Sequence, residues 1–201
     1  HADGYGFQRL GDVGNLPNGY TTTTFTPNCA LSYYGRLWVA DIGANTQKIY
    51  FSDLQNPTEW LTGTAGSLDI SAVIPTGDKI VALAAHNNNL IIFCKNHIVV
   101  YANPKDPANL TLSDVITGVG CIARDSIQSV AGTDLLFLSA TGVQSLQRVI
   151  QEKSLPFRDV SKNVRDELLS NVATETVENI KAVYYPTDAM YLLPLPATDT
   201  T

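Results

Sequence analysis

A unit of two short apolar runs joined by a tight turn recurs through this chain and constrains its fold more than any other sequence feature. The runs hold four to seven apolar, β-branched or aromatic residues, and Gly, Asn or Asp stands at each connection, as tight hairpins require. The second runs begin at Leu37, Leu90, Leu135 and Met190, roughly 45–55 residues apart. A third strand-like run follows three of these hairpins, at 48–51, 97–101 and 142–146. The pattern predicts a series of small antiparallel meanders.

Meanders repeated at this spacing are typical of the blades of a β-propeller. A single twisted meander cannot bury both of its faces, whereas stacked meanders cover one another. The run 80–85 is apolar throughout, as expected for a strand covered on both faces. We therefore predict an all-β chain of β-propeller blades, with an irregular N-terminal arm or loop at 1–28. About four blade units of a partial propeller are expected at 29–201, and we expect the chain to be a fragment of a longer subunit.

One segment departs from the strand pattern. Between Arg158 and Val172 the apolar residues are spaced at helical intervals, which places them on one face of an amphipathic helix. Asp159 or Ser161 can cap its start. We predict one short inserted helix near 159–172, packed on the rim of the propeller.

Charge and composition exclude several classes of function. The 201 residues are 44% hydrophobic and 16% charged, which suits one substantial core. The formal net charge of -6 disfavours a protein that binds nucleic acid by neutralising phosphates. No apolar run approaches the roughly 20 residues of a membrane-spanning helix. Three cysteines, Cys29, Cys94 and Cys121, are expected to be free buried thiols.

The sequence offers little that could bind a metal or a cofactor. Cys94 and His97 have a spacing that could supply two zinc ligands, but a structural zinc site needs four, so we expect a hairpin turn there. The glycine-rich stretch 63–67 lacks the following Lys-Ser/Thr of a phosphate-binding loop. We predict no metal, no cofactor and no catalytic residue.

Scattered carboxylates leave an alternative open. Several aspartates stand at strand ends, where their side chains cap turns, but propeller enzymes also gather acids at the mouth of the central channel. These residues are Asp41, Asp53, Asp69, Asp78, Asp114, Asp125 and Asp134. The alternative function is therefore a β-propeller domain that binds or degrades glycans, and a further one is a propeller acting only as an interaction scaffold.

The two tryptophans have different expected roles. Trp38 lies within a predicted strand and is expected in the core, where large rings fill the layers between sheets. Trp60 closes the run 51–60, and a place in the core or at an interface suits it almost equally. We take Trp60 as the candidate interface residue. If subunits of this kind assemble into a ring, we expect truncation of Trp60 to weaken ring assembly more than blade folding.

Several segments in order resemble one family. Residues 35–40 (GRLWVA) followed by 48–60 (KIYFSDLQNPTEW) are similar to a segment of the tail nozzle proteins, or tail tubular protein B, of short-tailed podovirus-like bacteriophages. Residues 80–101, 120–126 and 134–143 resemble successive hairpins and a blade entry of that family, and the start of the predicted helix resembles its helix start. The resemblance covers roughly residues 30–172.

The resemblance implies a structural role in the virion. Members of this family form a hexameric tube at the distal end of the phage tail, built from subunits that contain a multi-bladed propeller. The expected partners are five further copies in a homo-hexamer, the tail adaptor protein, the tail fibres, and genomic DNA that passes through the lumen without sequence-specific binding. The acidic net charge agrees with a wall that repels phosphates. The resemblance therefore implies a viral structural protein and not an enzyme.

Overall fold

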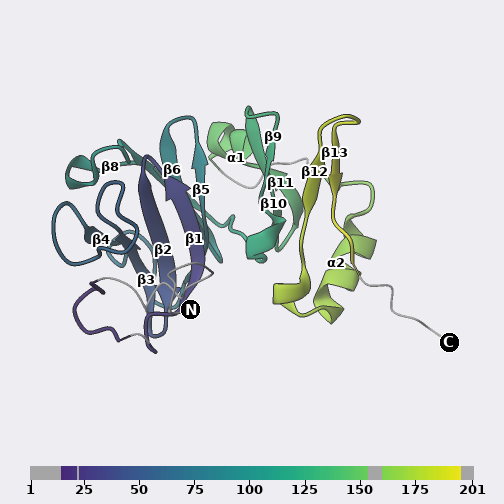
Figure 1. Cartoon of the computed structure of the whole chain (residues 1–201). Helices are drawn as coiled ribbons and strands as arrows, with labels where there is room; N and C mark the ends of the chain where they lie inside the picture. The colour runs from purple at the N-terminus through teal and green to yellow at the C-terminus, as the bar shows by residue number, and fades with distance from the viewer. Residues whose placement is uncertain (1–14, 22, 154–159, 196–201) are drawn as a thin grey trace, which may run out of the picture. The chain divides into compact units, whose positions relative to one another are not determined.

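The computed structural model describes residues 15–21, 23–153 and 160–195, and these residues form an all-β protein with two α-helices (Figure 1). The chain divides into two compact units, one up to Leu83 and one from Ala84 onward. The predicted boundary between an N-terminal arm and the blades, at residue 28, is a different division, and residues 1–14 lie outside the described part.

The first unit is built on a four-stranded antiparallel meander. Its strands are β1 (Pro27–Tyr33), β2 (Arg36–Ile42), β3 (Asn45–Phe51) and β4 (Gly66–Asp69), hydrogen-bonded in the order β1-β2-β3-β4. Tyr34 and Gly35 form the β1–β2 turn with φ of 48° and 69°, the left-handed pair that a two-residue hairpin turn requires. Trp38 is fully buried in β2, as the sequence predicted.

The described residues between 15 and 26 add no strand to this sheet but cover one of its faces. Phe25 packs with Val39, Ile42, Tyr50 and Trp60 in one buried cluster. Partly buried side chains of Leu16, Tyr20 and Leu37 surround this cluster. Tyr20, Phe25 and Tyr50 meet edge to face, with ring centroids 5.4–6.4 Å apart. The irregular segment thereby supplies the apolar layer that a sheet face needs.

The second meander repeats the architecture of the first. Its strands are β5 (Ile80–His86), β6 (Asn89–Cys94), β7 (His97–Ala102) and β8 (Thr111–Thr117), in the order β5-β6-β7-β8. Asn87 and Asn88 form the first turn with φ of 46° and 62°. Most residues of β6 and β7 are buried, which explains their nearly continuous apolar sequence. The boundary between the two units falls within β5.

The third sheet has three strands and a helix where a fourth strand would follow. It consists of β9 (Gln128–Val130), β10 (Asp134–Ser139) and β11 (Gly142–Ser145), in the order β11-β10-β9. Helix α1 (Leu146–Glu152) begins directly after β11, and the Ser145 side chain caps it by accepting a hydrogen bond from the Arg148 amide. Leu146, predicted to end a strand, is thus the first residue of a helix that the sequence pattern missed.

Further along the chain, two residues protect the edge of β11. The Val160 amide donates to the Val143 carbonyl at 3.0 Å, and the Val143 amide donates to Ser161 Oγ at 3.1 Å. These bonds satisfy main-chain groups that would otherwise form an open edge.

The predicted helix near 159–172 begins further along the sequence than expected. Helix α2 spans Arg165–Thr174 and has Val164 at its N-cap position without a side-chain capping bond. Asp159 lies outside the described residues, and Ser161 does not cap α2 because its hydroxyl serves the Val143 amide. Of the predicted apolar face, Val172 is buried, whereas Val160 and Val164 precede the helix and are exposed.

The last element of the described residues is a two-stranded antiparallel hairpin. Strands β12 (Val183–Tyr185) and β13 (Met190–Leu192) pair directly, and Figure 1 shows α2 beside them. Ala123, Leu138, Val143, Val172 and Ile180 form the buried cluster of this region, with Tyr191 and Leu193 packed against it.

Four antiparallel sheets therefore follow one another in the order of the chain, and the predictions of an all-β class and of the four hairpins are confirmed. Within the described residues these sheets remain separate and do not make a closed propeller. Among the same residues, no helix is both long enough and apolar enough to cross a bilayer.

Candidate functional site

A buried arginine organises the loop that follows β3. Arg36 donates from its guanidinium to the carbonyl oxygens of Ser52 at 2.8 Å and Thr64 at 3.1 Å, and to Thr64 Oγ1 at 2.8 Å. Asp53 accepts from the Thr64 amide at 2.8 Å and from its hydroxyl at 2.6 Å. These hydrogen bonds from Thr64 lower the pKa of the Asp53 carboxyl. Arg36 and Asp53, which both bind Thr64, therefore close the loop.

Glu59 fixes the far end of the same loop. Its Oε1 accepts from the amides of Leu61 at 3.0 Å and Thr62 at 2.8 Å, while Oε2 accepts from Asn15 Nδ2 at 2.6 Å. The Trp60 amide donates to the Asn15 carbonyl at 2.8 Å. The loop is thus joined to Asn15 through both Glu59 and Trp60.

Trp60, the candidate interface residue, lies inside the first unit. Its side chain is 3% exposed and packs edge to face on Phe25, with ring centroids 5.2 Å apart. Within the described residues its indole Nε1 has no hydrogen-bond partner. This position is the core alternative that the sequence left open, and a role in an interface remains a prediction.

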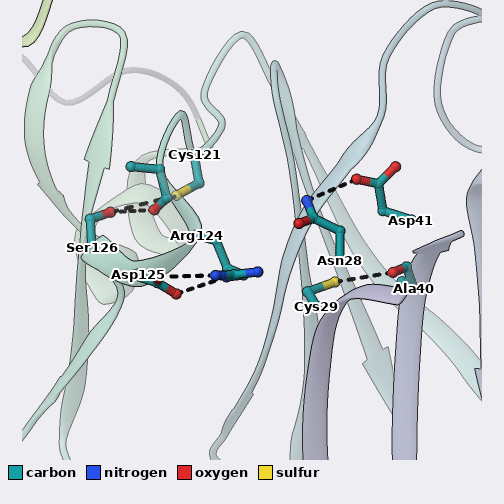
Figure 2. Close-up of polar contacts among 9 residues, drawn as sticks. Asn28, Cys29, Ala40, Asp41, Cys121, Arg124, Asp125 and Ser126 are labelled. Atoms are coloured by element: carbon teal, nitrogen blue, oxygen red, sulfur yellow. Dashed lines mark hydrogen bonds and ion pairs between the residues drawn. The ribbon is translucent and has the colours of Figure 1, made fainter. Parts of the chain in front are cut away.

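The segment after Gly120 forms a buried hydrogen-bonded turn (Figure 2). Cys121 Sγ donates to the Ala123 carbonyl at 3.1 Å, and Ser126 Oγ donates to the same carbonyl at 2.7 Å. Ser126 Oγ also accepts from the Leu138 amide at 3.0 Å. Burial raises the pKa of the Cys121 thiol to about 12. A thiol with such a pKa is protonated at neutral pH and is not a nucleophile.

A β-bulge in β2 holds another pair of polar residues, also drawn in Figure 2. The register of β2 against β3 shifts between Ala40 and Ile42, and Asp41 adopts a φ of 57°. Asn28 Nδ2 donates to Asp41 Oδ2 at 3.0 Å, and the Cys29 thiol, which is buried, donates to the Ala40 carbonyl at 3.7 Å. The left-handed residue is thereby tied to the neighbouring strand.

Most of the other aspartates singled out by sequence also have local partners. Asp69 accepts from the Ser71 amide at 2.9 Å, and Asp125 pairs with Arg124 at 2.7 Å. Asp134 accepts from Ser145 Oγ and from the Gln147 amide, which helps to start α1. The contacts of Asp69 and Asp134 are those of turn and helix caps, whereas Asp125 forms an ion pair with the adjacent residue.

Cys94 ends β6 and His97 begins β7, so the hairpin reading of this pair is confirmed. In the part of the chain that the structure describes, no three His, Cys, Asp or Glu side chains are grouped so that they could hold a metal ion.

An apolar groove in the second unit was not predicted from the sequence. It has a volume of about 440 Å³ and lies between the third sheet, α2 and the β12–β13 hairpin. Its lining includes Leu136, Val143, Val164, Leu168, Tyr191 and Leu193. These residues come from segments distant in sequence, so no local pattern could have indicated the groove.

The opposite side of this hairpin carries an exposed apolar patch. Val183 pairs with Leu192 and Tyr185 pairs with Met190, so all four side chains lie on one face. They are 42–58% exposed. We call these four residues the hairpin face, and it is the candidate interaction surface of the second unit.

The fold and these contacts define a class: an all-β protein of successive antiparallel meanders, whose polar side chains mostly hold turns and edges. Comparison of the sequence with protein-family models and with curated proteins finds no match.

Proposed function

We propose that this chain is a structural component of a bacteriophage tail and forms part of the distal hexameric nozzle tube through which DNA is ejected. The observation that carries the proposal is the succession of antiparallel meanders in chain order. Their positions agree with the segments that resemble tail nozzle proteins. We propose no enzymatic activity for the chain.

Each sheet is, in this proposal, one blade of a partial propeller. The segment after the second sheet supports this view because it bonds to two sheets in turn. The Cys121 amide donates to the Cys94 carbonyl at the end of β6 at 2.9 Å, and the Ile122 amide donates to the Leu138 carbonyl in β10 at 3.0 Å. The rings of Phe93 and Phe137, from the same two sheets, pack together with their centroids 4.9 Å apart. Such contacts suit adjacent blades that cover one another.

In this proposal the wall of the tube does not bind the DNA that passes through it. A net charge of -6 gives a surface that repels DNA phosphates, so DNA would slide past without sequence-specific contact. A ring of six copies closes through heterologous contacts, in which each copy uses two different patches. The tail adaptor protein and the tail fibres are the further proposed partners, and the virion is the proposed location.

The assembly state of the purified chain tests this proposal. We expect light scattering coupled to size exclusion to give six times the chain mass of 21.7 kDa, and negative-stain images to show sixfold rings or short tubes. A monomer at every concentration would contradict the hexamer. Hydrolysis of a host-surface glycan that is lost in paired Asp→Asn variants would instead support the enzyme alternative.

A further inference from the structure

We propose that Asn18 is a deamidation site, at which water and the main chain convert the side-chain amide to a carboxylate without an enzyme. Asn18 is the only asparagine of the chain that is followed by glycine. Glycine has no Cβ to hinder the approach of its main-chain nitrogen to the side chain before it. This property of one turn is separate from the proposed function and goes beyond it.

Asn18 and Gly19 are the two central residues of an exposed turn in the first unit. The Tyr20 amide donates to the Pro17 carbonyl at 3.1 Å and closes the turn. Gly19 has a φ of 89°, so the turn is of type II, in which the third residue needs a left-handed φ. Both central residues are exposed, and the amide that closes the turn is that of Tyr20 and not that of Gly19.

This turn must open before the reaction can occur. In a type II turn ψ of the second residue is about +120°, which keeps the Asn18 Cγ away from the Gly19 nitrogen. A rotation about this ψ brings the two atoms together and breaks the hydrogen bond from Tyr20 to Pro17. Segments with exposed main-chain hydrogen bonds open at a low cost in free energy. The fold therefore slows the reaction without preventing it.

The reaction consumes only water and releases ammonia. The main-chain nitrogen of Gly19 attacks Cγ of Asn18, so that a bond forms between these atoms and the bond from Cγ to Nδ2 breaks. Nδ2 leaves as ammonia and carries away the proton of the Gly19 nitrogen. Water then opens the cyclic imide at either of its carbonyl carbons. One opening gives aspartate, and the other gives isoaspartate, in which the main chain runs through Cβ and Cγ and is longer by a methylene group.

The isoaspartate product acts on the first sheet through Tyr20. The Tyr20 hydroxyl accepts hydrogen bonds from Asn45 Nδ2 and, at 3.2 Å, from the Tyr50 hydroxyl. Its ring packs edge to face on Phe25 and Tyr50, with centroids 5.5 Å and 5.4 Å away. A longer main chain just before Tyr20 displaces the ring from these partners. Deamidation therefore loosens the segment that covers this face of the sheet.

Peptide mapping by mass spectrometry, after the whole chain is incubated at mildly alkaline pH, tests the site. We expect the peptide that contains Asn18 to gain about 1 Da, the difference between an amide and a carboxylic acid. Asn87 and Asn88 are the matched controls, because they are exposed in a turn but lack a following glycine. Conversion at Asn18 should be at least tenfold faster than at either control. Gly19→Ala, which has open space for its methyl group, should slow the conversion by a similar factor. Equal rates at the three asparagines, or an unchanged rate in Gly19→Ala, would overturn the inference.

The melting temperatures of the products test the effect on the sheet. Anion exchange separates deamidated chains from unmodified ones by the added negative charge, and Asn18→Asp supplies the same charge with a normal main chain. We expect the isoaspartate form to melt at a lower temperature than Asn18→Asp, which should match the wild type. Equal melting temperatures of the isoaspartate form and Asn18→Asp would show that Tyr20 keeps its contacts, and would overturn the predicted loosening.

Discussion

Individual residues in this chain are required for reasons of space and hydrogen bonding that can be stated one by one. Gly120 lies where the chain passes from the second sheet to the third. A Cβ built on it would overlap the carbonyl oxygens of Cys94 and Lys95, both of them main-chain atoms that cannot move aside. Gly118, two residues earlier, has a left-handed φ of 78° but open space around its Cα.

The two glycines predict different costs of an added methyl group. Gly120→Ala should lower the free energy of unfolding by about 3 kcal/mol because of the overlap. Gly118→Ala should cost about 1 kcal/mol, which is the strain of a left-handed alanine. Urea unfolding followed by circular dichroism measures both. Equal losses would show that the close approach at Gly120 does not limit stability.

Trp60 allows the core and the interface roles to be separated. Because its ring is buried against Phe25, Trp60→Ala should lower the free energy of unfolding by about 3–5 kcal/mol, and Trp60→Phe should cost less. Thermal unfolding and the oligomer mass are measured on the same samples. Loss of the oligomer with an unchanged melting temperature would favour the interface role predicted from sequence.

At the scale of elements, turns and loops carry most of the polar contacts. The loop after β3 is closed by Asp53 and Thr64, and α1 is started by Ser145 and Asp134. The edge of β11 is covered by Ser161. Each of these contacts either joins residues at least 11 positions apart in the sequence or caps a new element. They therefore lie at the ends of strands and helices.

The loop after β3 predicts a specific pH dependence. Hydrogen bonds from Thr64 lower the pKa of Asp53 in the folded chain. The ionised carboxylate therefore stabilises the fold above the unfolded pKa of about 4, and this contribution is lost as the pH falls through the folded value. The urea midpoint of the wild type should therefore fall as the pH drops from 5 into the acid range below the unfolded pKa.

The Asp53→Asn variant removes this titration. Its midpoint should be lower than that of the wild type at pH 7 and should change less on acidification. Asp188→Asn, in the exposed turn of the last hairpin, is the control and should keep the pH dependence of the wild type. A parallel fall in all three proteins would show that other carboxylates dominate.

For the whole molecule, the acidic charge predicts indifference to DNA. With Lys and Arg outnumbered 13 to 19 by Asp and Glu, few phosphates can be neutralised. Fluorescence anisotropy of a labelled duplex at about 50 mM salt should show binding no tighter than ~100 µM, the weak limit of non-specific binding. Micromolar binding with steep salt dependence would contradict a passive wall.

Much of the local structure is predictable from the sequence. The runs around Leu37, Leu90, Leu135 and Met190 are all second strands of hairpins, because β-branched and aromatic runs bounded by Gly, Asn and Asp leave the backbone few other choices. Trp38 is buried as predicted, because a large ring within a strand fills the layer between sheets. The helix near 159–172 was predicted correctly in kind, but it begins only at Arg165, and Ser161 accepts a hydrogen bond from the distant Val143 amide, a contact that spacing does not reveal.

What the sequence alone determined, then, is the all-β class, the four hairpins and the turns between them, since these depend on neighbouring residues. Only the tertiary structure decided that Trp60 is buried against Phe25, that Leu146 begins α1, and that the apolar groove and the hairpin face lie on opposite sides of one hairpin. These features arise where segments distant in the chain meet, and the burial of a side chain depends on which segment covers it.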